Sequence, residues 1–220
     1  AATVIVRRKM RFIARIDKYM IGKVNVFPWI CITFAAQTDI KMRKITNDEL
    51  HRPSVEEYAS MGRIPVTVVA DNIRSAQNVG AFFRTCDAFA VEHLALCGIT
   101  AVPPSREIHK TALGAEVSVA WSRHASTEEC LADLKARGYR LLAVEQVEGA
   151  VMLDRVEIDP AERYALVFGN EVEGVSQQAV DMCDGAIEIP QAGTKHSLNV
   201  SVAGGVVLWP FFAALRSLVR

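Results

Sequence analysis

The residues of this chain that could do chemistry gather in three short segments. The first is NVGAFFRT, residues 78–85, which sets Asn78 and Arg84 in what reads as the start of a helix. The others are FGNEVEGVS (168–176) and IPQAGTKHSLNVSVAGG (189–205). Arginine can bind an anionic group through two parallel hydrogen bonds, and a carboxylate can offset a nearby positive charge. The elements around these segments decide whether they meet.

Each segment also has a purely structural interpretation. Asn78 could cap a helix, and Arg84 could be a solvated helix residue. In the second segment, Gly169 and Asn170 could supply positive φ angles, and Ser176 could cap the following helix. In the third segment a capping serine or asparagine would start a helix near residue 199. These interpretations do not explain why all three segments occur in one chain.

Short apolar runs predict the strands that would position these segments. They alternate with helical windows such as 127–138, which Gly138 ends. Runs buried on both faces are typical of parallel strands, so we expect a mostly parallel α/β sheet with helices on both faces. Ligands of such sheets bind at the carboxyl ends of the strands. The predicted strands are 65–71, 93–98, 139–145, 164–169 and 185–190.

Composition limits the kind of protein. The 220 residues include 25 basic and 25 acidic side chains, so a uniformly basic surface is excluded. Five cysteines lack a C-x-x-C pair or zinc-like histidine spacing, which predicts packing thiols of a cytoplasmic protein and no metal site. None of the usual glycine-rich nucleotide signatures occurs, which disfavours an NAD-binding enzyme.

The composition changes near residue 41. Residues 1–25 are basic and 26–36 are apolar, but Pro28 interrupts a run that is too short to span a bilayer. A targeting signal, a basic arm that contacts nucleic acid, and an extension outside the folded unit all remain open. We favour the extension, with the folded domain at residues 42–220.

In order and spacing, the three segments resemble the sequence motifs of the TrmH/SpoU branch of the SPOUT superfamily. The resemblance runs from about Pro65 to the C-terminus, and HKTALGAEVSV (109–119) adds to it. It implies an RNA ribose 2′-O-methyltransferase that uses S-adenosylmethionine. It also implies a homodimer and a C-terminal trefoil knot, a rare exception to the rule that protein chains are not knotted.

The resemblance also implies roles for individual residues. Arg84 would be the principal catalytic residue, either as a base or as a charged group that holds a phosphate and stabilises the alkoxide. Gly80, one turn earlier, would leave space for substrate. The other catalytic candidates are Asn78, Glu171, Ser197 and Asn199. The candidates for cofactor binding are Gly169, Asn170, Ile189, Pro190 and Leu198.

Four further residues outside this set have expected roles in RNA contact, in a loop or in packing. Lys195 could contact RNA phosphate, and we expect His196 to be a solvated loop residue. Trp121 and Trp209 are expected in the core or a subunit interface, and Trp209 beside two glycines favours an interface.

The substrate is expected to be tRNA or ribosomal RNA. The RTCDAF sequence (84–89) is closer to the tRNA guanosine-18 branch, which favours tRNA. The alternative is a non-catalytic RNA-binding or assembly protein with the same knotted fold.

Overall fold

The computed structural model describes residues 42–219 of the chain. The predicted extension at residues 1–41, with its basic and apolar stretches, lies outside the described residues, so the boundary at residue 41 stays a prediction. The chain divides between His51 and Arg52 into two compact units. In the described part of the first unit, the short 3-10 helix η2 (Asp48–Leu50) follows a turn in which Glu49 accepts hydrogen bonds from Arg43 and Thr46.

Seven strands form one sheet, and every recorded pairing between them is parallel. Their order across the sheet is β3-β2-β1-β6-β4-β7-β5. All five predicted strands are present, and β3 and β5 were not predicted. The strands are β1 (Ile64–Asp71), β2 (Val91–Cys97), β3 (Trp121–His124), β4 (Tyr139–Val144), β5 (Val151–Met152), β6 (Arg163–Phe168) and β7 (Gly185–Glu188).

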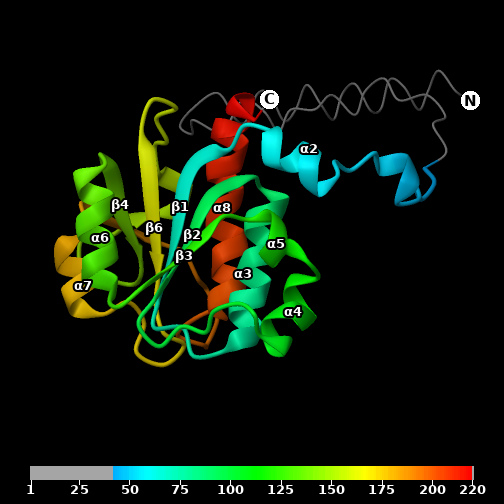
Figure 1. Cartoon of the computed structure of the whole chain (residues 1–220). Coiled ribbons are helices and arrows are strands. Elements are labelled where there is room, and N and C mark those ends of the chain that lie inside the picture. Colours follow the sequence, from blue (N-terminus) through cyan, green and yellow to red (C-terminus); the bar gives the residue numbers. More distant parts are fainter. Residues whose placement is uncertain (1–41, 220) are drawn as a thin grey trace, which may run out of the picture. The chain divides into compact units, whose positions relative to one another are not determined.

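Helices cover both faces of the sheet, as predicted. Figure 1 shows α6 and α7 on one side of the strands, and α3, α4, α5 and α8 on the other. Helix α6 ends before Gly138, whose φ of +79° is readily adopted only by glycine. The helices are α2 (Val55–Ser60), α3 (Ala76–Ala88), α4 (Arg106–Ala112), α5 (Ala115–Ser118), α6 (Thr127–Ala136), α7 (Gln177–Met182) and α8 (Val200–Leu215), with the 3-10 helices η3 (Leu153–Arg155) and η4 (Arg216–Leu218).

Side chains of alternate strand residues point to opposite faces of the sheet and pack into two separate hydrophobic cores. Val68 of β1 belongs to the core under α3 and α8, whereas its neighbour Val69 belongs to the core under α6. Three cysteines of the described residues are fully buried in these cores, and the fourth, Cys183, is partly buried. The predicted packing role of these thiols is therefore confirmed.

Close helix packing explains two glycines. A Cβ atom at Gly80 would collide with Thr111 and with the backbone of Ile108 on α4. The expectation that Gly80 leaves space for substrate was wrong, because it instead lets α3 approach α4 directly. Gly204 of α8 plays the same part against the ring of Phe82 on α3.

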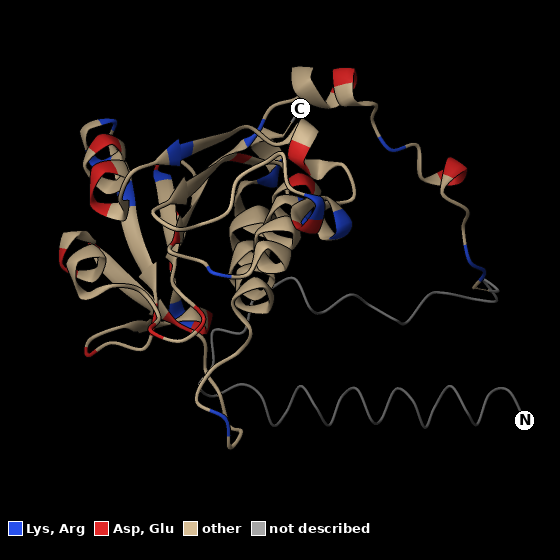
Figure 2. Ribbon diagram, turned by 60° about the horizontal axis from the view of Figure 1, so that its bottom comes forward, with Lys and Arg blue, Asp and Glu red and all other residues tan. Residues whose placement is uncertain are grey.

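The segment Val200–Leu218 is long and apolar enough to cross a membrane, with a mean hydropathy of 1.4. Its buried side chains include Val207, Leu208 and Phe211, so one face of the helix packs into the core of this domain. Residues 200–215 include no charged residue. In Figure 2 the helices at the centre are tan over most of their length, whereas those at the left carry bands of charged residues.

The contrast between Gly204 and its neighbour Gly205 gives a matched test of the α3 and α8 contact. We expect Gly204→Ala to lower the free energy of unfolding by about 1–3 kcal/mol, because the added methyl group overpacks against Phe82. Gly205→Ala meets no neighbouring atom and should raise it by roughly 0.5–1 kcal/mol through helix propensity. Denaturant unfolding of both variants measures the difference. Equal effects would show that the α3 contact does not constrain residue 204.

Candidate functional site

The three predicted segments converge at the carboxyl end of the sheet. Ala70 of β1 pairs with Phe168 of β6, so the turns that follow these two strands leave the sheet side by side. A cavity of about 660 Å³ opens there, bounded by the residues that follow β4, β6 and β7 and by the start of α8. Seven of the predicted site residues line it: Gly169, Asn170, Glu171, Ile189, Ser197, Leu198 and Asn199.

Asn78 connects all three segments. Ser75, not Asn78, is the N-cap of α3, since the Ser75 side chain accepts a hydrogen bond from the backbone nitrogen of Asn78. The Asn78 side chain donates from Nδ2 to Glu171 Oε1 at 2.8 Å. Its Oδ1 accepts from Asn199 Nδ2 at 3.2 Å and from Ser201 Oγ at 3.3 Å. Asn78 is 9% exposed, so its amide joins protein groups to one another.

Asn78, together with its hydrogen-bond partners Glu171 and Asn199, forms what we call the Asn78 bridge, and Glu171 also contacts the start of α3. Besides Asn78, its carboxylate accepts hydrogen bonds from the backbone nitrogens of Arg74 at 2.9 Å and Ser75 at 3.0 Å. Partial burial raises the pKa of Glu171, but the hydrogen bonds from Asn78, Arg74 and Ser75 outweigh it and hold the pKa below its usual value. Glu171 is therefore a fixed carboxylate at the N-terminus of α3, where the helix dipole also favours negative charge.

The turn at residues 169–175 folds back on itself. The backbones of Asn170 and Gly174 exchange two hydrogen bonds, of 2.9 and 3.0 Å, and Asn170 Nδ2 donates to the Asn72 carbonyl at 2.8 Å. Gly174 has the positive φ, of +72°, so the expectation for Gly169 and Asn170 was wrong. Gly169 is required because a Cβ atom there would meet the returning backbone at Gly174.

Ser176 begins α7 as predicted but makes no capping bond. Its side-chain oxygen is buried without a recorded partner, while its backbone nitrogen donates to Asp71 Oδ2 at 2.9 Å. Asp71, at the end of β1, is 1% exposed and also accepts from Thr127 Oγ1 at 2.5 Å. This buried carboxylate joins β1 to the starts of α6 and α7. Sequence reasoning recognised it only as the end of a strand.

The third segment starts α8 at the cavity. Asn199 is its N-cap, and its Oδ1 accepts from the backbone nitrogens of Ser201 and Val202. The same side chain donates to Asn78 through Nδ2, so one residue both caps α8 and holds α3. Residues 197–199 are exposed along the cavity wall.

Three predicted site residues do not line the cavity, namely Asn78, which is described above, Arg84 and Pro190. Arg84 is exposed on α3, six residues after Asn78, and makes no hydrogen bond or ion pair with any residue between 42 and 219. Six residues correspond to about 9 Å along a helix. Pro190 is exposed and follows Ile189 without lining the cavity.

Several cavity residues were missed from the sequence, although they end a predicted strand. The Glu145 carboxylate accepts from the backbone nitrogens of Gln146 at 2.8 Å and Val175 at 2.9 Å. Gln146 Nε2 donates to the His196 carbonyl at 2.6 Å. Glu188, at the end of β7, also lines the cavity. The rule that ligands bind at the carboxyl ends of strands would have found all three.

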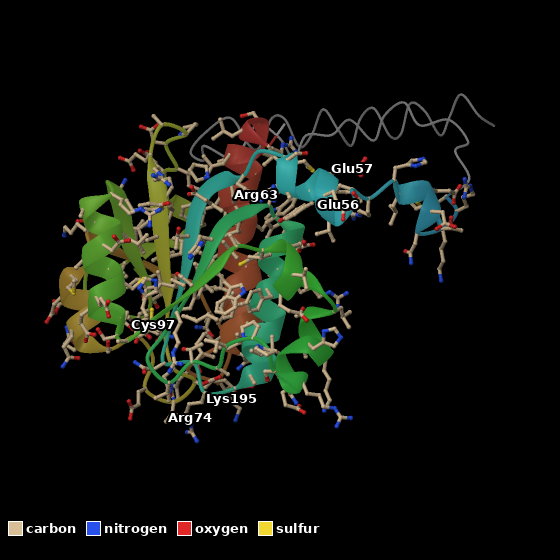
Figure 3. All side chains as sticks on the ribbon, viewed as in Figure 1. Glu56, Glu57, Arg63, Arg74, Cys97 and Lys195 are labelled. Carbon is tan, nitrogen blue, oxygen red and sulfur yellow. The ribbon has the colours of Figure 1, made fainter. Side chains whose placement is uncertain are left out.

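Within residues 42–219 no group of three or more His, Cys, Asp or Glu side chains is arranged to hold a metal ion. The functional groups that line the cavity are carboxylates, amides, hydroxyls, the imidazole of His196 and backbone groups. Figure 3 shows Arg74 and Lys195 at this same end of the molecule, where the strands end. These cations lie beside a cavity whose described lining contains neither lysine nor arginine.

The sequence and the fold both match known proteins. The SpoU rRNA Methylase family model matches residues 65–209. A tRNA (guanosine(18)-2′-O)-methyltransferase of Thermus thermophilus is 35% identical over 161 residues, which cover 73% of this chain and 81% of that protein. The Escherichia coli protein of the same description is 33% identical over 147 residues, which are 66% of this chain and 61% of that protein.

Solved structures agree. The A. aeolicus TrmH/SpoU tRNA modifying enzyme superposes with a TM-score of 0.65 at 29% identity, over 74% of this chain and 81% of that one. An AdoMet-bound rRNA methyltransferase from Sinorhizobium meliloti gives a TM-score of 0.64 at 28% identity, over 73% and 60% of the two chains. This chain, in which the hydrogen bonds of Asn78 join the three motifs beside one cavity, belongs to the SpoU rRNA methylase family.

Proposed function

We propose that this protein transfers a methyl group from S-adenosylmethionine to a ribose 2′-hydroxyl of RNA, with tRNA as the favoured substrate. The observation that carries the proposal is the hydrogen-bonded bridge of Glu171, Asn78 and Asn199, which joins the three family motifs at one cavity. The descriptions of the Thermus thermophilus and Escherichia coli relatives, both tRNA 2′-O-methyltransferases, support tRNA.

The cavity suits S-adenosylmethionine in size and charge. Its volume of about 660 Å³ is in the usual range for a cofactor site. Ile189 and Leu198 offer apolar surface and backbone groups for an adenine ring, and the backbone of Gly169 lies beside them. The carboxylates in the lining suit a ligand with a positive sulfonium, and they are Glu145, Glu171, Glu173 and Glu188. When bound, the cofactor supplies the electrophilic methyl group.

The residues of this chain would orient and activate the ribose. The 2′-oxygen must lie in line with the methyl group, and its proton must leave as the new C–O bond forms. The bond from the methyl carbon to sulfur would break in the same step, with S-adenosylhomocysteine as the leaving group. We propose that Arg84, as a charged guanidinium, grips the adjacent RNA phosphate and stabilises the developing alkoxide. The proton then passes to a phosphate oxygen or to water. The Asn78 bridge holds α3, and therefore Arg84, at a fixed position relative to the cavity.

We further propose the family's knotted, dimeric form. In this arrangement the segment from β7 to α8 would pass through a trefoil knot. The outer face of α8 is apolar, with Val202 53%, Val206 40% and Trp209 55% exposed, and Phe89 stacks against Phe212 beside it. Such a face suits a second copy of the chain. A dimer would also bring an Arg84 from each copy near the two cavities. A cytoplasmic location follows from a tRNA substrate.

Arg84→Ala tests the catalytic assignment. We expect methyl transfer from labelled S-adenosylmethionine to tRNA to fall by about 10²–10³-fold, because the alkoxide loses its charged partner. The cofactor Kd, measured by calorimetry, should stay unchanged, since Arg84 does not line the cavity. The control is Arg155→Ala, which removes an exposed cation directly after the edge strand β5. If wild type binds RNA but methylates none, the non-catalytic alternative holds. An active Arg84→Ala would remove Arg84 from the mechanism.

Exchanging the hydrogen-bond donor and acceptor between residues 78 and 171 tests the role of Asn78. Asn78→Asp places two carboxylates at hydrogen-bond distance, so we expect it to lower stability by about 1–3 kcal/mol and turnover by about tenfold or more. The double variant Asn78→Asp with Glu171→Gln restores a carboxylate and amide pair and should recover part of both losses. A double-mutant cycle of unfolding free energies and kcat values measures the coupling. Additive losses would show that the bridge is dispensable.

A further inference from the structure

A second concave surface lies at the β3 edge of the domain, apart from the cofactor cavity. It is a groove of about 650 Å³, bounded by the loop after β2, by α4 and α5, and by Trp121 at the start of β3. We call it the edge groove. Its lining shares no residue with the cofactor cavity. The lining residues are Pro103, Pro104, Ser105, Arg106, His109, Glu116, Val117 and Trp121.

The edge groove combines an aromatic wall with a cation. Trp121 is partly exposed and is braced from beneath by the buried ring of Phe83, which meets it edge to face at 6.5 Å between centroids. Arg106, in the first turn of α4, forms no ion pair among the described residues. Stacking surfaces with nearby cations are how proteins hold unpaired nucleotides.

The other polar groups of the groove differ in how far they are exposed. Glu116 is held by His109 Nδ1 at 2.5 Å and by the Gly114 backbone nitrogen at 3.0 Å, and its side chain is only 13% exposed. The His109 side chain is 69% exposed. The groove therefore presents an imidazole and a guanidinium outward while its carboxylate is withdrawn.

The position of the edge groove relates it to the proposed reaction. Helices α4 and α5 lie beside α3, the helix that carries Arg84 (Figure 1). The Thr111 hydroxyl on α4 donates to the Gln77 carbonyl in the first turn of α3 at 2.9 Å, so the groove is fixed to the element that would meet the target ribose.

We infer that the edge groove binds an unpaired nucleotide of the RNA substrate, with its base against Trp121 and its phosphate on Arg106. This inference rests on the proposed function for the identity of the RNA. Part of the Trp121 side chain packs against the core, as expected from the sequence, and the inference assigns its exposed part to substrate binding. An apolar peptide is the other occupant that the groove suggests, but it would leave the Arg106 charge unmatched.

Binding of a fluorescent single-stranded oligoribonucleotide, without cofactor, tests the inference. Trp121→Leu keeps apolar packing on Phe83 but removes the stacking surface, so we expect RNA affinity to fall roughly ten- to hundredfold. Trp121→Phe should recover most of it. Arg106→Gln should lower the slope of log affinity against log salt by about one, because one phosphate contact is lost. Arg155→Gln, beyond the opposite edge strand, should change neither quantity.

The outcomes separate this inference from the proposed function. If wild type methylates tRNA and Trp121→Leu binds RNA within twofold of wild type, the inference is overturned and the function stands. The same holds if the Phe and Leu variants lose affinity equally. If wild type transfers no methyl group but the variants weaken RNA binding as expected, the inference that the edge groove binds RNA is supported and the proposed methyl transfer is rejected. Should Trp121→Leu not fold, photo-crosslinking of 4-thiouridine RNA decides, since crosslinks absent from peptide 103–121 contradict the inference.

Discussion

The carboxylate of Glu171 on the start of α3 is the interaction on which the site depends. The backbone nitrogens of Arg74 and Ser75, just before α3, and the side-chain nitrogen of Asn78 all donate to this one carboxylate, nearly a hundred positions later in the chain. The turn after β6 and the helix after β1 therefore cannot move independently. Asn199 extends this coupling to α8, so the walls of the cavity and the helix with Arg84 form one hydrogen-bonded unit.

Much of the fold could be predicted because its signal is local. Parallel strands such as β1 and β6 are buried on both faces and read as continuous apolar runs. The strand β3 was missed because WSRH is a short edge strand with polar residues, and β5 has only two residues. The role of Gly80 was misjudged because close approach to α4 is a tertiary contact that no local pattern reports.

The candidate site was predictable where residue type and strand position agree. Gly169, Glu171 and Leu198 lie at one cavity because turns after neighbouring parallel strands must meet. The hydrogen bonds of Asn78 were not predictable, since a side chain at the third position of a helix can face solvent or a neighbouring turn. Glu145 and Gln146 belong to none of the three motifs, and only their position directly after β4 places them at the cavity.

The shape of the turn at residues 170–174 is set by backbone hydrogen bonds and does not depend on the side chain at its tip. Its two backbone hydrogen bonds fix Asn170 and Gly174, while Val172, at the tip, is 76% exposed and borders the cavity. Side chains at the tip can therefore change with little effect on the hydrogen bonds that shape the turn. A cysteine placed at position 172 and labelled with an environment-sensitive dye would give a direct optical signal of ligand entry, because the dye would stand at the rim on a rigid base.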